Sequence, residues 1–179
     1  MNSFRFRKSG STDSPSEMIA PQFRQSCSAD FPAAMQKYIE QIHGTDLWIS
    51  CKDGIENAKK IKDELVSANS YASDPEQVVK LQEMFTKDYQ NSMLFNKYFS
   101  FGGKKDQINV QFKYKDSFSG SNVQSYNALF DALGSKYNIG VALARRACYM
   151  NLEGDSIKHA CQSFQQAAWI FDDLSKNVS

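Results

Sequence analysis

Apolar residues recur with helical spacing in the first part of the chain. Residues 31–42 carry one apolar face, formed by Phe31, Met35, Tyr38, Ile39 and Ile42. Asp30 stands where a helix cap is favoured, and Gly44 stands where a helix ends. A second stripe predicts a helix over residues 46–68, with Trp48, Cys51, Ile55, Ala58, Ile61 and Leu65 inward. Because the link between them is so short, the two helices are predicted to form a hairpin.

A third helix and a strand are predicted in the middle of the chain. Residues 73–76, Ser-Asp-Pro-Glu, form a capping box that opens a helix ending before Gly102. Its inward residues are Val78, Leu81, Phe85 and Tyr89. In residues 108–115 every second residue is apolar, which is typical of a strand with one buried face. Because a lone strand leaves its edges unpaired, we expect it to pair with residues 19–24 and, as a further candidate, with residues 4–7.

Two further helices are predicted over residues 123–150 and 156–174. The first is rich in small residues that let a neighbouring helix approach closely, namely Gly134, Gly140, Ala142, Ala144 and Ala147. The short linker at residues 151–155 predicts that the two helices are antiparallel neighbours, in the manner of a tetratricopeptide unit. The sequence therefore predicts a mainly α fold. Its helical hairpins form a curved, tetratricopeptide-like solenoid, with a small antiparallel β-sheet near the N-terminal half.

Composition supports one folded domain behind a short leader. The first 17 residues are small and polar and predict a flexible leader, so the domain is expected over residues 18–179. Of 179 residues, 41% are hydrophobic and 13% aromatic, which is enough to bury a core. The net charge of +1 gives no overall positive field that would attract nucleic acid or an anionic membrane. With no long apolar run and no signal peptide, the chain is expected in the cytoplasm.

The residue types that carry catalysis are sparse and scattered. Four cysteines, with neither a CxxC pair nor zinc-ligand spacing, predict free and mostly buried thiols; they are Cys27, Cys51, Cys148 and Cys161. The histidines His43 and His159 stand far apart, and phosphate-loop, serine-hydrolase and zinc-peptidase motifs are absent. Asp155 and His159 are spaced to form a surface pair rather than a catalytic dyad. We therefore expect no catalysis, no cofactor and no metal.

Four short segments resemble the Bro-one domain, the Alix-like family. Residues 112–118 are similar to the family's strand, which ends in aromatic-x-aromatic-Lys-Asp-small-Phe. Residues 130–131, Phe-Asp, stand where the family has Tyr-Glu, and residues 137–140, Tyr-Asn-Ile-Gly, are similar to its Phe-Asn-Ile-Gly. Residues 164–174 are similar to its Phe-Gln-x-Ala-Ala-x-x-Phe-x-x-Leu helix. The resemblance covers residues 18–179, as the N-terminal portion of a longer family domain.

Each of these motifs also has a structural explanation of its own. Asn138 is expected to satisfy backbone groups inside the helical bundle, and Gly140 to permit close packing. Three residues of the last helix are expected in the core, namely Phe164, Ala167 and Ala168. The motifs therefore argue for the fold, and only membership of the family argues for function.

The resemblance implies a non-catalytic scaffold of endosomal sorting and the multivesicular body pathway. Bro-one domains bind the C-terminal amphipathic helix of ESCRT-III subunits, which would recruit this chain to endosomes through its partners alone. The family carries an acidic residue at the rim of the partner groove. Here that residue is Asp155 or, because the spacing is one residue shorter, Glu153; we prefer Asp155. Alternatively, Asp155 only caps the last helix.

Two further readings of function stay open at this point. Other Bro-one domain proteins are pH-signalling or Rho-pathway scaffolds, and a generic helical-repeat interaction module does not act on ESCRT-III at all.

The last helix also carries three consecutive large apolar residues, Trp169, Ile170 and Phe171. Because a helix with one buried face cannot hide all three, we expect the chain to associate with itself.

Overall fold

Helices dominate the described part of the protein. The structure, a computed structural model, describes residues 3–5, 17–19, 21–27, 29–68, 74–116, 120–150 and 153–177. In chain order the elements are β1 (Ser3–Arg5), β2 (Glu17–Ile19), β3 (Gln25–Ser26), α1 (Phe31–Ile42), α2 (Thr45–Ala68), α3 (Pro75–Tyr98), β4 (Phe112–Lys115), β5 (Asn122–Ser125), α4 (Ala128–Tyr149) and α5 (Ser156–Asn177). The predicted mainly α fold with a small antiparallel sheet is confirmed.

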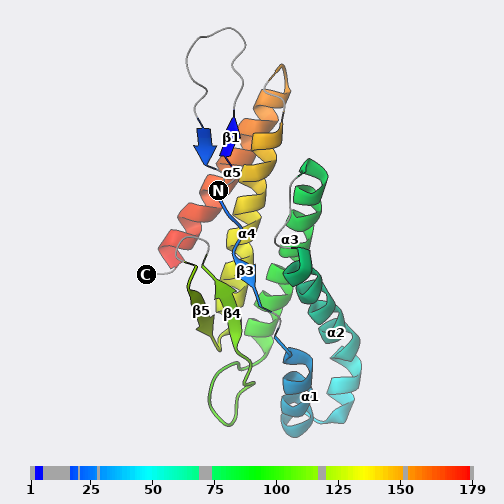
Figure 1. Ribbon diagram of the computed structural model, residues 1–179. Helices are drawn as coiled ribbons and strands as arrows, with labels where there is room; N and C mark the ends of the chain where they lie inside the picture. Colours follow the sequence, from blue (N-terminus) through cyan, green and yellow to red (C-terminus); the bar gives the residue numbers. More distant parts are fainter. Residues whose placement is uncertain are drawn as a thin grey trace.

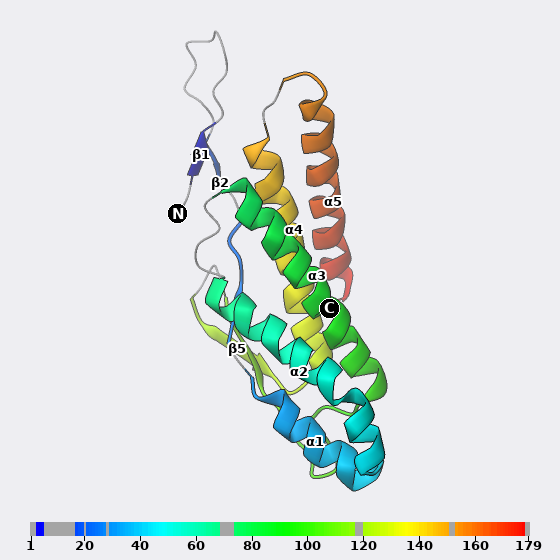
Figure 2. The same cartoon turned by 90° about the vertical axis from the view of Figure 1, so that its right-hand side faces the viewer.

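The helix α4 lies between two antiparallel neighbours. On one side it packs against α3, and on the other it forms a hairpin with α5 (Figure 1). Gly140 lies where α5 crosses most closely, because a Cβ atom there would stand 2.8 Å from a ring carbon of Phe171. The expected roles of Gly140 and of the short linker are therefore confirmed. The α1–α2 hairpin packs beside the lower part of α3 (Figure 2).

The strand β4 is the centre of a three-stranded antiparallel sheet, in the order β3-β4-β5. Alternate residues of this segment are buried as expected, namely Ile108, Val110, Phe112 and Tyr114. The predicted partners were wrong. Residues 25–26 and 122–125 flank β4, whereas β1 pairs with β2. The ladder is also shorter than predicted, because Ile108 makes an isolated bridge to Phe101. The proposed boundary at residue 17 stays a prediction.

The start of α4 differs from the sequence prediction. Residues 123–126 were expected in the helix, but Val123 pairs with Tyr114 in the sheet. The helix begins only at Ala128, where the side chain of Asn127 accepts a hydrogen bond from the Leu129 N–H at 2.8 Å. Asparagine is a favoured helix cap, and the strand before it satisfies one edge of β4. Local capping and long-range pairing together override the helical spacing.

Several smaller expectations need correction. Asp30 stands at the cap position of α1, but its side chain makes no capping hydrogen bond. Asp74 caps α3 by accepting from the Gln77 N–H, while Ser73 lies outside the described residues. Ile42, the last residue of α1, was expected on its apolar face but is 49% exposed. Ala168 is exposed, since it points away from α4, whereas Ala167 is buried and Phe164 partly buried.

Candidate functional site

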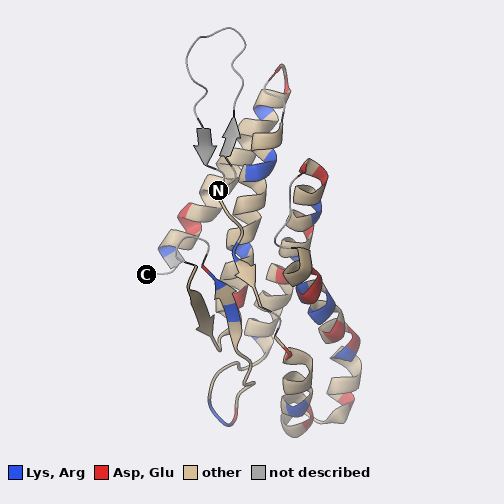
Figure 3. Cartoon of the chain, in the orientation of Figure 1, with Lys and Arg blue, Asp and Glu red and all other residues tan. Residues whose placement is uncertain are grey.

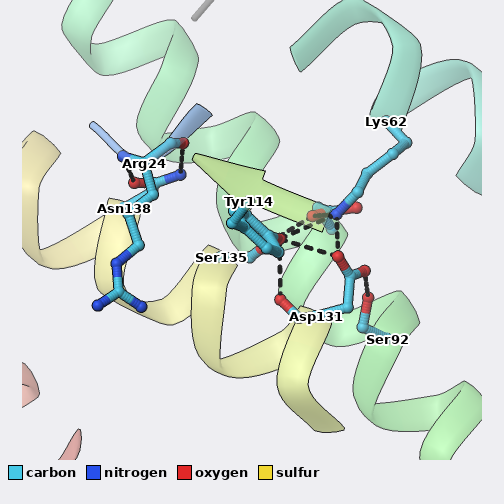
Figure 4. A network of polar contacts seen from close by, with 8 residues as sticks. Arg24, Lys62, Ser92, Tyr114, Asp131, Ser135 and Asn138 are labelled. Carbon is cyan, nitrogen blue, oxygen red and sulfur yellow. Dashed lines mark hydrogen bonds and ion pairs between the residues drawn. The ribbon is translucent and has the colours of Figure 1, made fainter. Parts of the chain in front are cut away.

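A buried ionic network joins α2, α3, α4 and β4. The Lys62 ammonium lies 2.9 Å from a carboxylate oxygen of Asp88 and 2.5 Å from one of Asp131. It also lies 3.2 Å from the Tyr114 hydroxyl. The Lys62 side chain is 2% exposed, and both carboxylates are nearly as buried. One residue from each of four elements therefore meets at a single point (Figure 4).

Hydroxyl groups donate further hydrogen bonds to both carboxylates. Ser92 Oγ donates to Asp131 at 2.8 Å, and the Tyr114 hydroxyl donates to the other Asp131 oxygen at 2.8 Å. Ser135 Oγ donates a short hydrogen bond to Asp88. Buried charge is tolerated when it is both paired and hydrogen-bonded. With two carboxylates and one ammonium, the network carries one negative charge when all three groups are ionised.

The network raises the pKa values of Asp88, Lys62 and Tyr114. Burial raises the pKa of the Asp88 carboxyl, which the Lys62 ammonium opposes and the Asp131 charge reinforces. Burial alone would lower the pKa of Lys62, but the charges around it, Asp131 foremost, hold its pKa well above the ordinary value. Burial, and then the Asp131 charge, raise the pKa of Tyr114. These groups cross-link the scaffold, and none of them faces an open surface.

Asn138 fixes the approach of the N-terminal segment to α4. Its side-chain oxygen accepts from the Arg24 N–H at 2.8 Å, and its amide donates to the Arg24 carbonyl at 2.9 Å (Figure 4). Asn138 is fully buried, so these two hydrogen bonds replace those that a strand partner would supply. The role expected of Asn138 from the sequence is confirmed.

The two predicted binding residues lie in the turn between α4 and α5. Gly154 takes a left-handed conformation, with φ of +57°, and the Glu153 carbonyl accepts from the Ser156 N–H. Both Glu153 and Asp155 are exposed. The Asp155 carboxylate lies 3.0 Å from Lys158 Nζ, with side chains 87% and 77% exposed respectively. Among the described contacts, this carboxylate pairs with Lys158 rather than with a backbone N–H at the helix start.

Among the described residues, a larger and a smaller groove lie between helices. The larger, about 990 Å³, runs between α2 and α3 over Leu81 and Met84. Its charged rim contains both signs, with Glu56, Lys59, Lys60, Asp63, Glu64 and Lys80 (Figure 3). The smaller, about 560 Å³, carries no charge and is lined by Gln82, Leu143, Gln162, Gln165, Gln166, Trp169 and Ile170. Neither Glu153 nor Asp155 lines either groove.

The described residues contain no group of three potential metal ligands. All four cysteines are free, but the expectation that they are mostly buried was wrong, because Cys27 and Cys161 are exposed. Cys161 lies on the outer side of α5, away from α4. No helix within the described ranges is both long and apolar enough to cross a bilayer.

Comparison with protein-family models identifies the family of this chain. The model of the BRO1-like domain matches residues 18–179. This is the Bro-one family that the motifs in β4, α4 and α5 resemble. Comparison with curated proteins gave no match. Comparison with solved structures gave no match either.

Proposed function

Because the chain belongs to the BRO1-like domain family, we propose that it acts as a non-catalytic adaptor in endosomal sorting. The observation that carries this proposal is the family match over residues 18–179, together with a fold built from helical hairpins. Fold alone does not establish function, so the specific partner needs its own argument.

The proposed partner is the C-terminal amphipathic helix of an ESCRT-III subunit. Such a helix is recognised through apolar anchors in a groove, while charges at the rim set orientation and association rate. The turn at Asp155 supports this role, since it presents an exposed carboxylate at the end of the α4–α5 hairpin. A basic residue of the incoming helix would compete with Lys158 for this carboxylate. Glu153, two residues earlier, is the alternative contact.

The buried network supports the same role indirectly. A scaffold binds with less loss of entropy when its helices are already held in their bound arrangement. Lys62 ties α2 to α3 and α4, so the helix that leads into the turn is part of a rigid unit. The chain would reach the endosome from the cytoplasm through its partner.

Binding of labelled ESCRT-III C-terminal peptides tests the proposal directly. Fluorescence anisotropy with the 179-residue chain should show saturable binding. The Asp155→Asn variant should weaken it by about threefold to tenfold, and the difference should shrink with added salt because an exposed charge is screened. The melting temperature should barely move, since a highly exposed ion pair adds little stability.

Asp46 offers a matched control. It is an exposed aspartate in the first turn of α2, distant in sequence from the proposed rim. Asp46→Asn should leave peptide binding unchanged. Failure of every ESCRT-III peptide to bind would overturn the proposed partner and favour a generic helical-repeat module. Equal affinity in the wild type, Asp155→Asn and Glu153→Gln would remove the turn from the binding site.

A further inference from the structure

We propose that the outer face of α5 pairs with α5 of a second copy of this chain, in antiparallel orientation. We call this face the outer seam. It consists of Asp155, directly before the helix, and of Lys158, Gln162, Gln165, Trp169, Asp172 and Lys176 on the helix. These residues recur at alternating intervals of three and four, so they form one stripe along the helix. All of them are exposed, and Trp169 is 64% exposed.

The seam lies on the exposed side of α5, and its centre borders the neighbouring helices. The Lys136 ammonium of α4 lies 5.6 Å from the centroid of the Trp169 ring, and the seam residues Gln162, Gln165 and Trp169 line the smaller groove. The buried residues of α5 form a different stripe that contacts α4, namely Ala160, Ser163, Ala167, Ile170 and Leu174. In Figure 2, α5 forms the outer edge of the described helical layer, with α4 on its inner side. Among the described residues, the seam side chains are exposed to solvent and can be reached by a second copy of the chain.

The charges on the seam specify which partner fits. The middle of α5, residues 160–171, contains no charged residue, and the seam charges stand at the two ends. Asp155 with Lys158 marks one end, and Asp172 with Lys176 marks the other. An antiparallel copy, with its two-fold axis beside Gln165, sets Asp155 opposite Lys176 and Lys158 opposite Asp172. Each end then gathers two carboxylates and two ammonium groups, with opposite charges facing each other.

A parallel arrangement would give the reverse result. Asp155 would face Asp155 of the second copy, and Lys176 would face Lys176, so like charges would oppose one another along the seam. The helix dipoles give the same preference, because the antiparallel copy places each positive N-terminal end beside a negative C-terminal end. The seam is therefore self-complementary in one orientation only.

The uncharged centre of the seam supplies the apolar contact. In the same register Trp169 of the second copy stands opposite Gln162, which lines the smaller groove. That groove has a volume of about 560 Å³ and an uncharged lining, with Leu143 and Ile170 as apolar members. A tryptophan is a favoured anchor at interfaces, and an interface with two-fold symmetry uses it twice. The glutamine amides around it supply hydrogen-bonding groups at the rim.

Sedimentation equilibrium of the 179-residue chain tests the pairing. A reversible dimer is expected, and Trp169→Glu should weaken it by about tenfold or more. The matched control is Tyr98→Glu, another exposed aromatic residue on α3, which should leave the dimer unchanged. A monomer at every concentration, or a dimer that Trp169→Glu leaves intact, would overturn the proposal.

Exchange of the terminal charge pairs tests the orientation. The double variant Asp155→Lys with Lys158→Asp keeps an ion pair within each copy but sets like charges against the second copy. It should weaken the dimer by about tenfold, and less so in about 0.5 M salt. Adding Asp172→Lys and Lys176→Asp exchanges both ends and should restore the affinity to within about threefold of the wild type. No loss in the double variant, or no recovery in the quadruple variant, would refute the antiparallel register.

Discussion

Replacing Lys62 by methionine should destabilise the fold more than any single change at the surface. Methionine keeps most of the apolar stem but removes the ammonium group. The carboxylates of Asp88 and Asp131, which lie 2.9 and 2.5 Å from that ammonium, would then face each other without a counter-charge. Both carboxylates are buried beneath α2, α3 and α4, so water cannot replace the lost cation without opening the structure.

The size of the effect follows from the burial of the three groups. Removing one partner of a buried ion pair costs about 3–5 kcal/mol, because an uncompensated charge remains in a low-dielectric interior. For a chain of this length, each kcal/mol corresponds to about 2–4 °C in melting temperature. Lys62→Met should therefore lower the melting temperature by about 6–20 °C. Part of the cost is avoided if Asp88 takes up a proton, since burial already raises the pKa of that carboxyl.

The two carboxylates should respond differently to neutralisation. Asp88→Asn removes the excess negative charge and leaves Lys62 paired with Asp131, so its cost at neutral pH should stay below about 1 kcal/mol. Asp131→Asn should cost about 3 kcal/mol, because Asp131 accepts from Lys62, Ser92 and Tyr114 at once. In Lys62→Met, adding Asp88→Asn should recover part of the lost stability, since it removes one of the two unpaired charges.

Urea unfolding followed by circular dichroism measures these free energies, with the slope on denaturant checking that each variant unfolds as a single unit. The wild type and Asp88→Asn should have similar free energies of unfolding. Asp131→Asn should be less stable than both, and Lys62→Met should be as unstable as Asp131→Asn or more so. If Lys62→Met unfolds within 1 kcal/mol of the wild type, the buried charges are not coupled as their distances imply. If Asp88→Asn costs as much as Asp131→Asn, the excess charge does not reside on Asp88.

Three further outcomes are expected. The pKa values of Lys62 and Tyr114 lie above their ordinary 10.5 and 10.0, so the folded state keeps protons that the unfolded chain releases at high pH. The free energy of unfolding should therefore fall as pH rises above about 10, by up to about 3 kcal/mol per pH unit. In urea titrations, Tyr114→Phe should roughly halve this dependence on pH. In thermal melts, Gly134→Ala should destabilise the protein by about 1–2 kcal/mol, since the added Cβ would stand 2.5 Å from the Tyr114 ring. Gly54→Ala adds a Cβ in open space on a helix, so it should stabilise the protein by up to about 1 kcal/mol. The reverse order of the two variants would contradict this packing. Asn138→Ala should cost about 2–4 kcal/mol and speed hydrogen exchange at the Arg24 amide, and unchanged exchange there would argue against the two hydrogen bonds.

Helical periodicity predicted the five helices of the described chain within a few residues at most ends, because each one buries a single stripe. It failed where a long-range contact decided the structure. Residues 123–126 continue the spacing of α4, yet residues 123–125 belong to β5 because the edge of β4 needs a partner. The strand partner at residues 25–26 was missed for a related reason: two residues are too few to show an alternation in the sequence.

The ionic network was missed although the sequence contains a signal for it. Lys62 stands in phase with Ile55, Ala58 and Leu65 on the buried stripe of α2. Asp88 and Ser92 continue the buried stripe of α3, and Asp131 and Ser135 lie on that of α4; all four are buried. A charged residue in phase with an apolar stripe on three separate helices predicts that the charges meet. Periodicity assigns each one to the interior, but it does not say which carboxylate faces which ammonium, since that depends on how the helices cross.

The distinction between inward and outward residues decides what the family motifs mean. Three motif residues that resemble the Bro-one family act inside the scaffold. Asp131 belongs to the ionic network, Asn138 bonds the Arg24 backbone, and Gly140 packs against Phe171. A partner cannot reach any of them. The proposed partner contacts use exposed positions instead: Asp155 in the turn, and Trp169, which stands at a variable position of the α5 motif. Since Asp155 lies at one end of that seam, pairing of two copies would cover the turn, and a peptide that binds at Asp155 should shift the dimer towards monomer.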